Sequence, residues 1–152
     1  MNPTSPVIFV EVPGRPVPWA RAGSQGNRRY TPSRVRAAAE SLQAEMKVQC
    51  RSPLTGPLDL AITFCYRRPD SWNKAKREAI DNGEEPWFSG RPDIDNLCKL
   101  VMEAGTGILW EDDAQVVSLE AVKVYGAENL TVLNLSCAWR VNENISQGQS
   151  DL

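Results

Sequence analysis

The segment from Leu58 to Tyr66 constrains the fold of this chain more than any other part of its sequence. Every second residue in it is large and apolar, and the residues between are small or polar. That alternation is the period of a β-strand, whose successive side chains point to opposite faces. Two arginines and a proline follow at 67–69, and a proline there ends the strand. The clearest predicted element is therefore a strand over residues 58–66.

Three more strands are predicted, and the last two are expected to pair with each other. Residues 6–12 are rich in β-branched and aromatic residues and end at a Pro-Gly turn. Residues 116–125 and 130–139 have the same character, and Gly-Ala-Glu-Asn stands between them. That short polar connection predicts a hairpin.

Two main helices are expected, one on each side of the 58–66 strand in the sequence. The second begins with Asp93 as its N-cap and closes at Gly105 or Gly107. The first has Ser33 as its N-cap, and its apolar face is formed by Val35, Ala38, Ala39, Leu42 and Met46.

A shorter helix and a polar loop are expected between the two main helices. Asp70 or Ser71 caps the helix, which runs to about Ile80 and has a basic face. Residues 84–90 form the loop, which contains a proline and a glycine and leads to a group of aspartates.

The length of the chain fits one domain with a core that needs no disulfide or structural metal. We expect a single α+β domain over residues 1–142, in which a mixed sheet of about four strands packs with the two main helices. Residues 143–152 are polar and are expected to be a disordered tail.

The absence of histidine from the chain excludes several kinds of active site. Nucleophile triads that contain histidine, His-ligated zinc sites and imidazole bases cannot form, so hydrolytic chemistry must rest on carboxylate, metal or lysine. The four cysteines lack zinc or redox spacing and are expected to be small buried hydrophobes in a reducing cytosol. The sequence has no apolar run of roughly 18 to 20 residues and no signal-peptide pattern, so we expect a soluble cytoplasmic protein without a membrane partner.

Charge is divided unevenly along the chain. Residues 1–77 contain 13 Lys and Arg against 5 Asp and Glu, whereas residues 78–152 contain 4 against 14. A basic half of +8 beside an acidic half of −10 points to a nucleic-acid partner, although an unevenly charged solvated surface explains these numbers equally well. The residues expected to contact DNA are Arg15, Arg21, Arg28, Arg29, Arg67, Arg68, Lys74, Lys76 and Arg77.

Residues 15–32 form a basic arm rich in proline and glycine. Trp19 in this arm either stacks on a DNA base or covers the core, and the sequence favours neither. Arg34 and Arg36 follow in the first turn of the first main helix, where positive charge opposes the helix dipole unless an anion binds. A phosphate would relieve that conflict.

Acidic residues are concentrated at two places in the second half of the chain. Asp93 and Asp95 open the second main helix, and Lys99 lies four residues after Asp95 on the same helical face. Helix capping and a surface ion pair would explain these three residues without any site. Glu111, Asp112 and Asp113 then precede a predicted strand, and their mutual repulsion calls for a compensating charge such as a divalent cation.

The motifs Asp-Ile-Asp-Asn-Leu-Cys-Lys at 93–99 and Trp-Glu-Asp-Asp-Ala-Gln-Val-Val at 110–117 resemble those of the RusA family of Holliday junction resolvases. These are small endodeoxyribonucleases of bacteria and their prophages. The resemblance covers most of residues 8–125 and includes Gly-Arg-Pro-Val-Pro at 14–18. At 103–107 this chain reads Glu-Ala-Gly-Thr-Gly where many relatives have Asp-Ala-Leu-Asn-Gly, so the end of the helix is altered.

The resemblance implies a site, a cofactor and a partner. The metal-binding and catalytic acids of the family map to Asp93, Asp95 and Asp113, and its essential lysine maps to Lys99, which leaves Asp112 as a neighbour. The resemblance also implies a RusA-like fold, dependence on Mg²⁺ with Mn²⁺ as a substitute, a homodimer, and branched DNA such as a four-way junction as substrate.

These inferences together predict a magnesium-dependent endodeoxyribonuclease that makes paired incisions in Holliday junctions during DNA recombination and repair. Asn96 is expected to brace the site by hydrogen bonds and not to bind metal. One alternative is a catalytically inert protein that binds branched DNA. Another is a nucleotide phosphohydrolase, which the absence of a glycine-rich phosphate loop disfavours.

Overall fold

Four strands form one mixed sheet in the order β1-β6-β4-β5. The computed structural model describes residues 7–26 and 28–138. β4 pairs antiparallel with β6 and parallel with β5, and β6 pairs antiparallel with β1. The bounds of these strands are β1 Ile8–Pro13, β4 Leu58–Arg67, β5 Val116–Gly126 and β6 Leu130–Cys137. The predicted four-stranded mixed sheet is confirmed.

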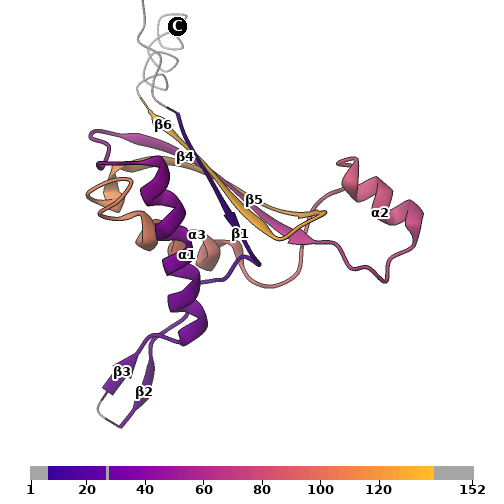
Figure 1. Cartoon of the computed structure of the whole chain (residues 1–152), viewed down its shortest axis with the longest axis horizontal. Coiled ribbons are helices and arrows are strands. Elements are labelled where there is room, and N and C mark those ends of the chain that lie inside the picture. The colour runs from indigo at the N-terminus through magenta and orange to yellow at the C-terminus, as the bar shows by residue number, and fades with distance from the viewer. Residues whose placement is uncertain (1–6, 27, 139–152) are drawn as a thin grey trace, which may run out of the picture.

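Two helices, α1 (Ser33–Gln49) and α3 (Ile94–Gly105), pack together against one face of this sheet, α1 beside β1 and α3 beside β5 (Figure 1). The alternating apolar residues of β4 are buried beneath them, while the residues between are half-buried. Burial of that face is the main stabilising term of the fold. The predicted α+β arrangement with two main helices is confirmed.

The predicted hairpin between the last two strands is wrong. β4 lies between β5 and β6, so these two strands have no shared ladder. The connection from Gly126 to Asn129 instead crosses the end of β4, where the Arg68 amide donates to Gly126 O at 2.9 Å and the Arg67 amide to Asn129 Oδ1 at 2.8 Å. The reason is burial: β4 has the most regular apolar alternation in the chain, and the centre of the sheet buries it best.

Two helix starts also differ from prediction. α1 has Pro32 as its N-cap, without a side-chain capping bond, so Ser33 is the first helical residue. The shorter helix, α2 (Lys74–Asp81), starts later than expected because the side chain of Asn73 accepts from the Lys76 amide at 2.8 Å. Asp70 forms an ion pair with Arg67 instead of capping. The expected ends of α2 and α3 are confirmed.

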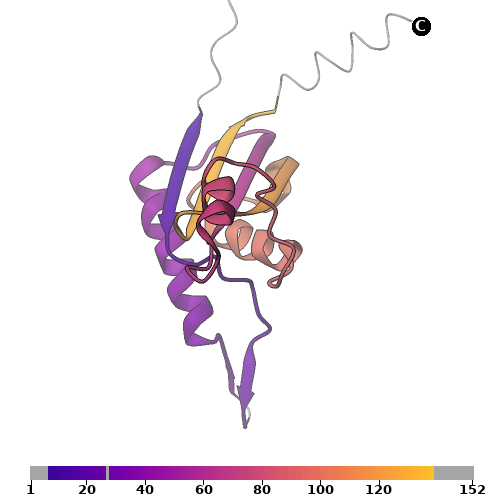
Figure 2. The same ribbon diagram turned by 90° about the vertical axis from the view of Figure 1, so that its right-hand side faces the viewer.

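The basic arm contains an element that the sequence did not predict. Two short strands, β2 (Gly23–Gln25) and β3 (Arg28–Tyr30), pair antiparallel and project away from the sheet beyond the start of α1 (Figures 1 and 2). α2 projects at another side of the molecule. None of the described helices has both the length and the apolar character needed to cross a membrane. The predicted last residue of β6 and the predicted tail 143–152 lie outside the described residues.

We expect substitution of Gly105 by alanine to destabilise the fold. A Cβ at this position would lie 2.7 Å from Cζ2 of Trp110, a fully buried ring whose Nε1 donates to Thr106 Oγ1 at 3.2 Å. Alanine favours a helix over glycine by about 1 kcal/mol, but overpacking a rigid core costs about 1 to 3 kcal/mol. Thermal unfolding of Gly105→Ala should therefore show a lower Tm. In a Trp110→Phe background the same substitution should cost less, and an equal cost in both backgrounds would contradict the packing argument.

Candidate active site

Three of the four predicted catalytic residues line a single open pocket between α3 and β5. Asp95 and Lys99 come from α3, and Asp113 comes from η1 (Asp113–Gln115), the single helical turn that leads into β5. The pocket has a volume of about 540 Å³. Residues four apart lie on one face of a helix, and the entrance of β5 faces the same side of α3. The tertiary structure therefore brings the two separate motifs together.

The neighbours Asp112 and Asp113 have different roles in the structure. Asp112 is the N-cap of η1, and its Oδ1 accepts from the Ala114 amide at 2.9 Å. Gln115 completes a capping box, because its Oε1 accepts from the Asp112 amide at 3.1 Å. Asp113 is exposed, and within the described structure its carboxylate has neither a hydrogen bond nor an ion pair. The Asp113 carboxylate is thus free to bind a ligand, whereas the Asp112 carboxylate already accepts a hydrogen bond from a backbone amide.

Asp93 is the N-cap of α3 by position, but its side chain makes no capping hydrogen bond. It lines a neighbouring pocket of about 620 Å³ together with Asn96. The Asp95 carboxylate accepts a hydrogen bond from the Asn96 amide at 2.9 Å. Neither Asp93 nor Asp95 forms an ion pair with a described cation. Capping therefore does not account for Asp93.

The described residues contain no group of three or more Asp, Glu, Cys or His side chains already arranged around a metal position. The predicted ligand set of Asp93, Asp95 and Asp113 is divided between two adjoining pockets. Its chemistry nevertheless fits a hard cation, because Mg²⁺ takes one or two carboxylates and completes its shell with water and substrate phosphate. Three exposed carboxylates without cationic partners supply such ligands, and the metal site stays a prediction.

Lys99 contacts an aromatic ring and not the carboxylate beside it. Its Nζ lies 3.4 Å from the centroid of the Trp19 ring, a cation–π contact, and no ion pair joins it to Asp95. Trp19 is half-buried against the core, and its amide donates to Asn96 O at 2.9 Å. The surface ion pair suggested by the sequence is therefore not formed. Trp19 covers the core, as one of the two sequence alternatives proposed, and also holds Lys99.

Cys98 lies in the same pocket and remains a thiol. Burial raises its pKa, and the negative charge of Asp95 raises it further. A thiolate nucleophile is therefore disfavoured at this site. All four cysteines are free. Cys50 and Cys98 are buried as predicted, whereas Cys65 and Cys137 are only partly buried.

Lys123 on β5 holds the segment that precedes Asp93. Its Nζ donates to Gly90 O at 2.6 Å and to Pro92 O at 2.8 Å. Residues 86–88 pair with the outer edge of β5 through the Phe88 amide, which donates to Lys123 O at 3.0 Å, and the Tyr125 amide, which donates to Pro86 O. Sequence alone did not single out Lys123, whose contacts hold this segment in place. An isolated lysine within an apolar strand is the signal that could have identified it.

Several of the predicted DNA-contacting residues are paired with acids in the structure. Arg67 contacts Asp70, Arg68 contacts Asp81 at 2.8 Å, and Lys74 lies 3.8 Å from Glu78. The hydrogen bond from Arg68 lowers the pKa of the Asp81 carboxyl. Arg67, Arg68 and Lys74 are therefore compensated, whereas Lys76 and Arg77 form no ion pair with an acid of the described residues. Arg15 and Arg21 are exposed, while the backbone of Arg28 and Arg29 lies in β3.

The sequence of this chain matches the family model described as endodeoxyribonuclease RusA over residues 13–135. The chain belongs to the RusA family. The matched range contains both acidic motifs and Lys123. RusA membership therefore agrees with the resemblance on which the site prediction was based.

Two curated relatives match part of the chain. The crossover junction endodeoxyribonuclease rusA of Lactococcus phage r1t is 34% identical over 76 residues, which are 48% of this chain and 49% of the phage protein. The uncharacterized protein YqaN of Bacillus subtilis (strain 168) is 33% identical over 78 residues, which are 49% of this chain and 54% of YqaN. The chain thus spans about half the length of these curated relatives.

Proposed function

We propose that this chain is a magnesium-dependent endodeoxyribonuclease that resolves Holliday junctions by paired incisions. Its proposed role is DNA recombination and repair in the cytoplasm of a prophage-bearing or phage-infected cell. The observation that carries the proposal is the position of Asp95, Lys99 and Asp113 around one open pocket. The two motifs that supply them are separated by ten residues of the sequence. RusA family membership and the name of the phage relative support the substrate.

The roles proposed for the acids follow from their lack of other partners. Asp95 and Asp113, together with Asp93, would hold Mg²⁺, or Mn²⁺ in its place, on the scissile phosphate. A bound divalent ion would polarise a phosphate oxygen and lower the pKa of a water molecule. Asp95 already accepts one backbone hydrogen bond, which reduces the freedom of its carboxylate.

Lys99 is proposed to stabilise negative charge as it develops on the phosphate. Its ammonium rests on the Trp19 ring, which supports it without neutralising it, since an aromatic face holds a cation but carries no net charge. A lysine paired with a carboxylate would first have to break that pair.

Selectivity for branched DNA is proposed to come from a homodimer. Two copies related by a twofold axis would present two sites to opposing strands of a four-way junction. The alternative is a catalytically inert protein that binds branched DNA. The exposed and unpaired state of Asp113 favours the nuclease, because a binding protein gains nothing from uncompensated acids facing DNA.

The decisive experiment compares a labelled four-way junction with a linear duplex of the same arm sequence, in Mg²⁺ and in EDTA, using the wild type and Asp95→Asn. Symmetric incisions in the junction that require Mg²⁺ and vanish in Asp95→Asn would establish the nuclease. Junction binding without incision under Mg²⁺ or Mn²⁺ would establish the inert alternative. Sedimentation of the protein with and without junction would test the homodimer.

We expect Trp19→Leu to slow incision without a large loss of stability. Leucine retains apolar contact with the core but removes the ring face under Lys99, a contact worth about 0.5 to 1 kcal/mol or roughly a two- to fivefold change in rate. Single-turnover cleavage and thermal unfolding measure the two effects. Trp87→Leu is the matched control, because Trp87 is 65% exposed and does not contact Lys99. Equal rates for the two variants would contradict this role of Trp19.

A further inference from the structure

Three arginines from segments far apart in the sequence line the pocket that contains Asp93. Arg15 follows β1, Arg34 lies in the first turn of α1, and Arg91 lies just before α3. Asp93 is the single acid among the residues that line this pocket. The pocket is thus a positively charged hollow with a predicted catalytic carboxylate at its border.

None of these three arginines forms an ion pair with a carboxylate in the described part of the chain. This separates them from Arg67 and Arg68, whose guanidinium groups are paired. Like charges that converge without a counter-charge repel each other. A fold that nevertheless brings them together presents a site for an anionic ligand with more than one charge.

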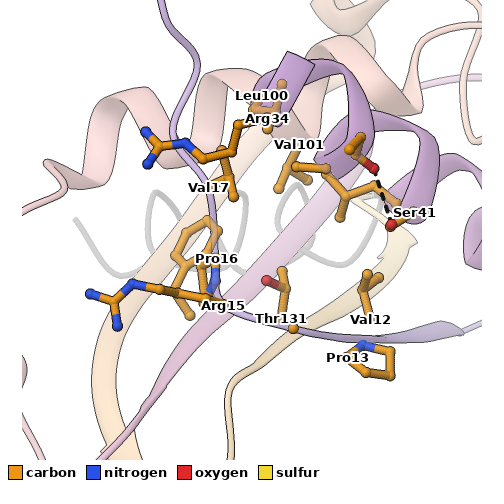
Figure 3. Close-up of a pocket in the computed structure, with 15 residues that line it drawn as sticks. Val12, Pro13, Arg15, Pro16, Val17, Arg34, Ser41, Leu100, Val101 and Thr131 are labelled. Atoms are coloured by element: carbon orange, nitrogen blue, oxygen red, sulfur yellow. Dashed lines mark hydrogen bonds between the residues drawn. The ribbon is translucent and has the colours of Figure 1, made fainter. Parts of the chain in front are cut away.

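The positions of the arginines are set by their surroundings. The guanidinium of Arg15 lies 4.9 Å from the centroid of the Tyr66 ring. Arg91 stands between Gly90 and Pro92, the two residues whose carbonyls Lys123 holds. Figure 3 shows the side chains of Arg15 and Arg34 extending to the same side of an adjoining cavity of about 270 Å³ that they also line. The three arginines therefore line the same pocket before any ligand binds.

We infer that Arg15, Arg34 and Arg91 form a phosphate-binding groove that guides one DNA strand to Asp93. Phosphates along a strand are spaced regularly, and arginine forks from separate elements match several of them at once. The groove adds Arg91 to the expected DNA contacts and places the phosphate expected near Arg34 beside Asp93. The inference rests on the proposed function, since it specifies how the substrate of that same site is held.

Binding measured in EDTA tests the groove independently of cleavage. Arg34→Gln and Arg91→Gln are compared with Arg51→Gln for binding to a fluorescent four-way junction over a series of salt concentrations. Arg51 is an exposed control that follows the opposite end of α1, about 25 Å from Arg34 along a helix of this length. Far-UV circular dichroism and thermal unfolding confirm that each variant is folded.

Each groove variant should bind the junction about five- to tenfold more weakly than wild type near 0.1 M salt, and should lower the slope of log K against log salt by about one. The weakening should be the same for junctions of different sequence, because phosphate contacts do not read bases. Affinities and slopes equal to those of Arg51→Gln would overturn the groove. Failure of the wild type to cut in Mg²⁺ would contradict the nuclease proposal, whereas the binding data alone decide the groove.

Discussion

Asp113→Asn is expected to abolish junction incision, whereas Asp112→Asn is expected to leave it nearly unchanged. The two substitutions remove the same charge from adjacent residues of the same loop. Asp113 is exposed and without partners in the described structure, so its carboxylate is available to a metal. Loss of such a ligand should slow incision by at least about a hundredfold. Asp112 instead caps η1 through the Ala114 amide, and asparagine caps a helix as well as aspartate does.

Cleavage rates at several Mg²⁺ concentrations measure this contrast. Partial recovery of Asp113→Asn at high Mg²⁺ or in Mn²⁺ would support a role in metal binding. Asp112→Ala should cost about 1 kcal/mol of stability through the lost cap yet keep its metal dependence. Equal loss of activity in Asp112→Asn and Asp113→Asn would contradict the division of roles and would indicate that the local charge matters more than a specific ligand.

Lys123→Met is expected to impair both the stability and the activity of the protein. The substitution removes two charged hydrogen bonds, to Gly90 O and Pro92 O, and hydrogen bonds to charged groups are worth about 1.5 to 3 kcal/mol each. Lys123 is half-buried, so part of this is lost to solvent screening, and we expect a net loss of about 2 kcal/mol. Incision should fall by more than tenfold even well below the Tm, because the segment entering Asp93 is no longer held.

Thermal unfolding and cleavage at a temperature where the variant is fully folded separate the two effects. Lys47→Met is a suitable control, since Lys47 is exposed in the last turn of α1 and away from the pocket. Lys123→Arg should restore part of both properties because arginine retains the donors. Loss of stability with an unchanged rate in Lys123→Met would show that the lysine supports the fold but does not position Asp93.

Local patterns in the sequence were sufficient to predict the four sheet strands and the three helices, but not the β2–β3 pair in the basic arm. The alternation in β4 and the apolar stripes of α1 and α3 arise from side-chain periodicity, which depends on neighbours only a few residues away. The common face of Asp95 and Lys99 follows from the same geometry. The helix starts were less predictable, because Asp70, Ser71 and Asn73 are all good caps. In the structure Asp70 forms an ion pair with Arg67, and Asn73 caps the helix.

Pairing between distant segments could not be predicted in this way. The position of β4 between β5 and β6 depends on how much apolar surface the whole sheet buries. The short connection after β5 therefore does not join two paired strands. For the same reason the sequence did not reveal that Trp19, 80 residues before Lys99 in the numbering, supports its ammonium.

The sequence by itself determined which residues are the candidates for the chemistry: the aspartates and lysine of two motifs, with histidine excluded by composition. Only the tertiary structure decided which of them are free to act. It assigned Asp112 to a cap and left Asp113 exposed, and it paired Arg67 and Arg68 with acids while leaving the arginines beside Asp93 without them. The physical reason is that residue type sets what a side chain can bind, whereas the partners that compete for it come from segments brought close only by folding.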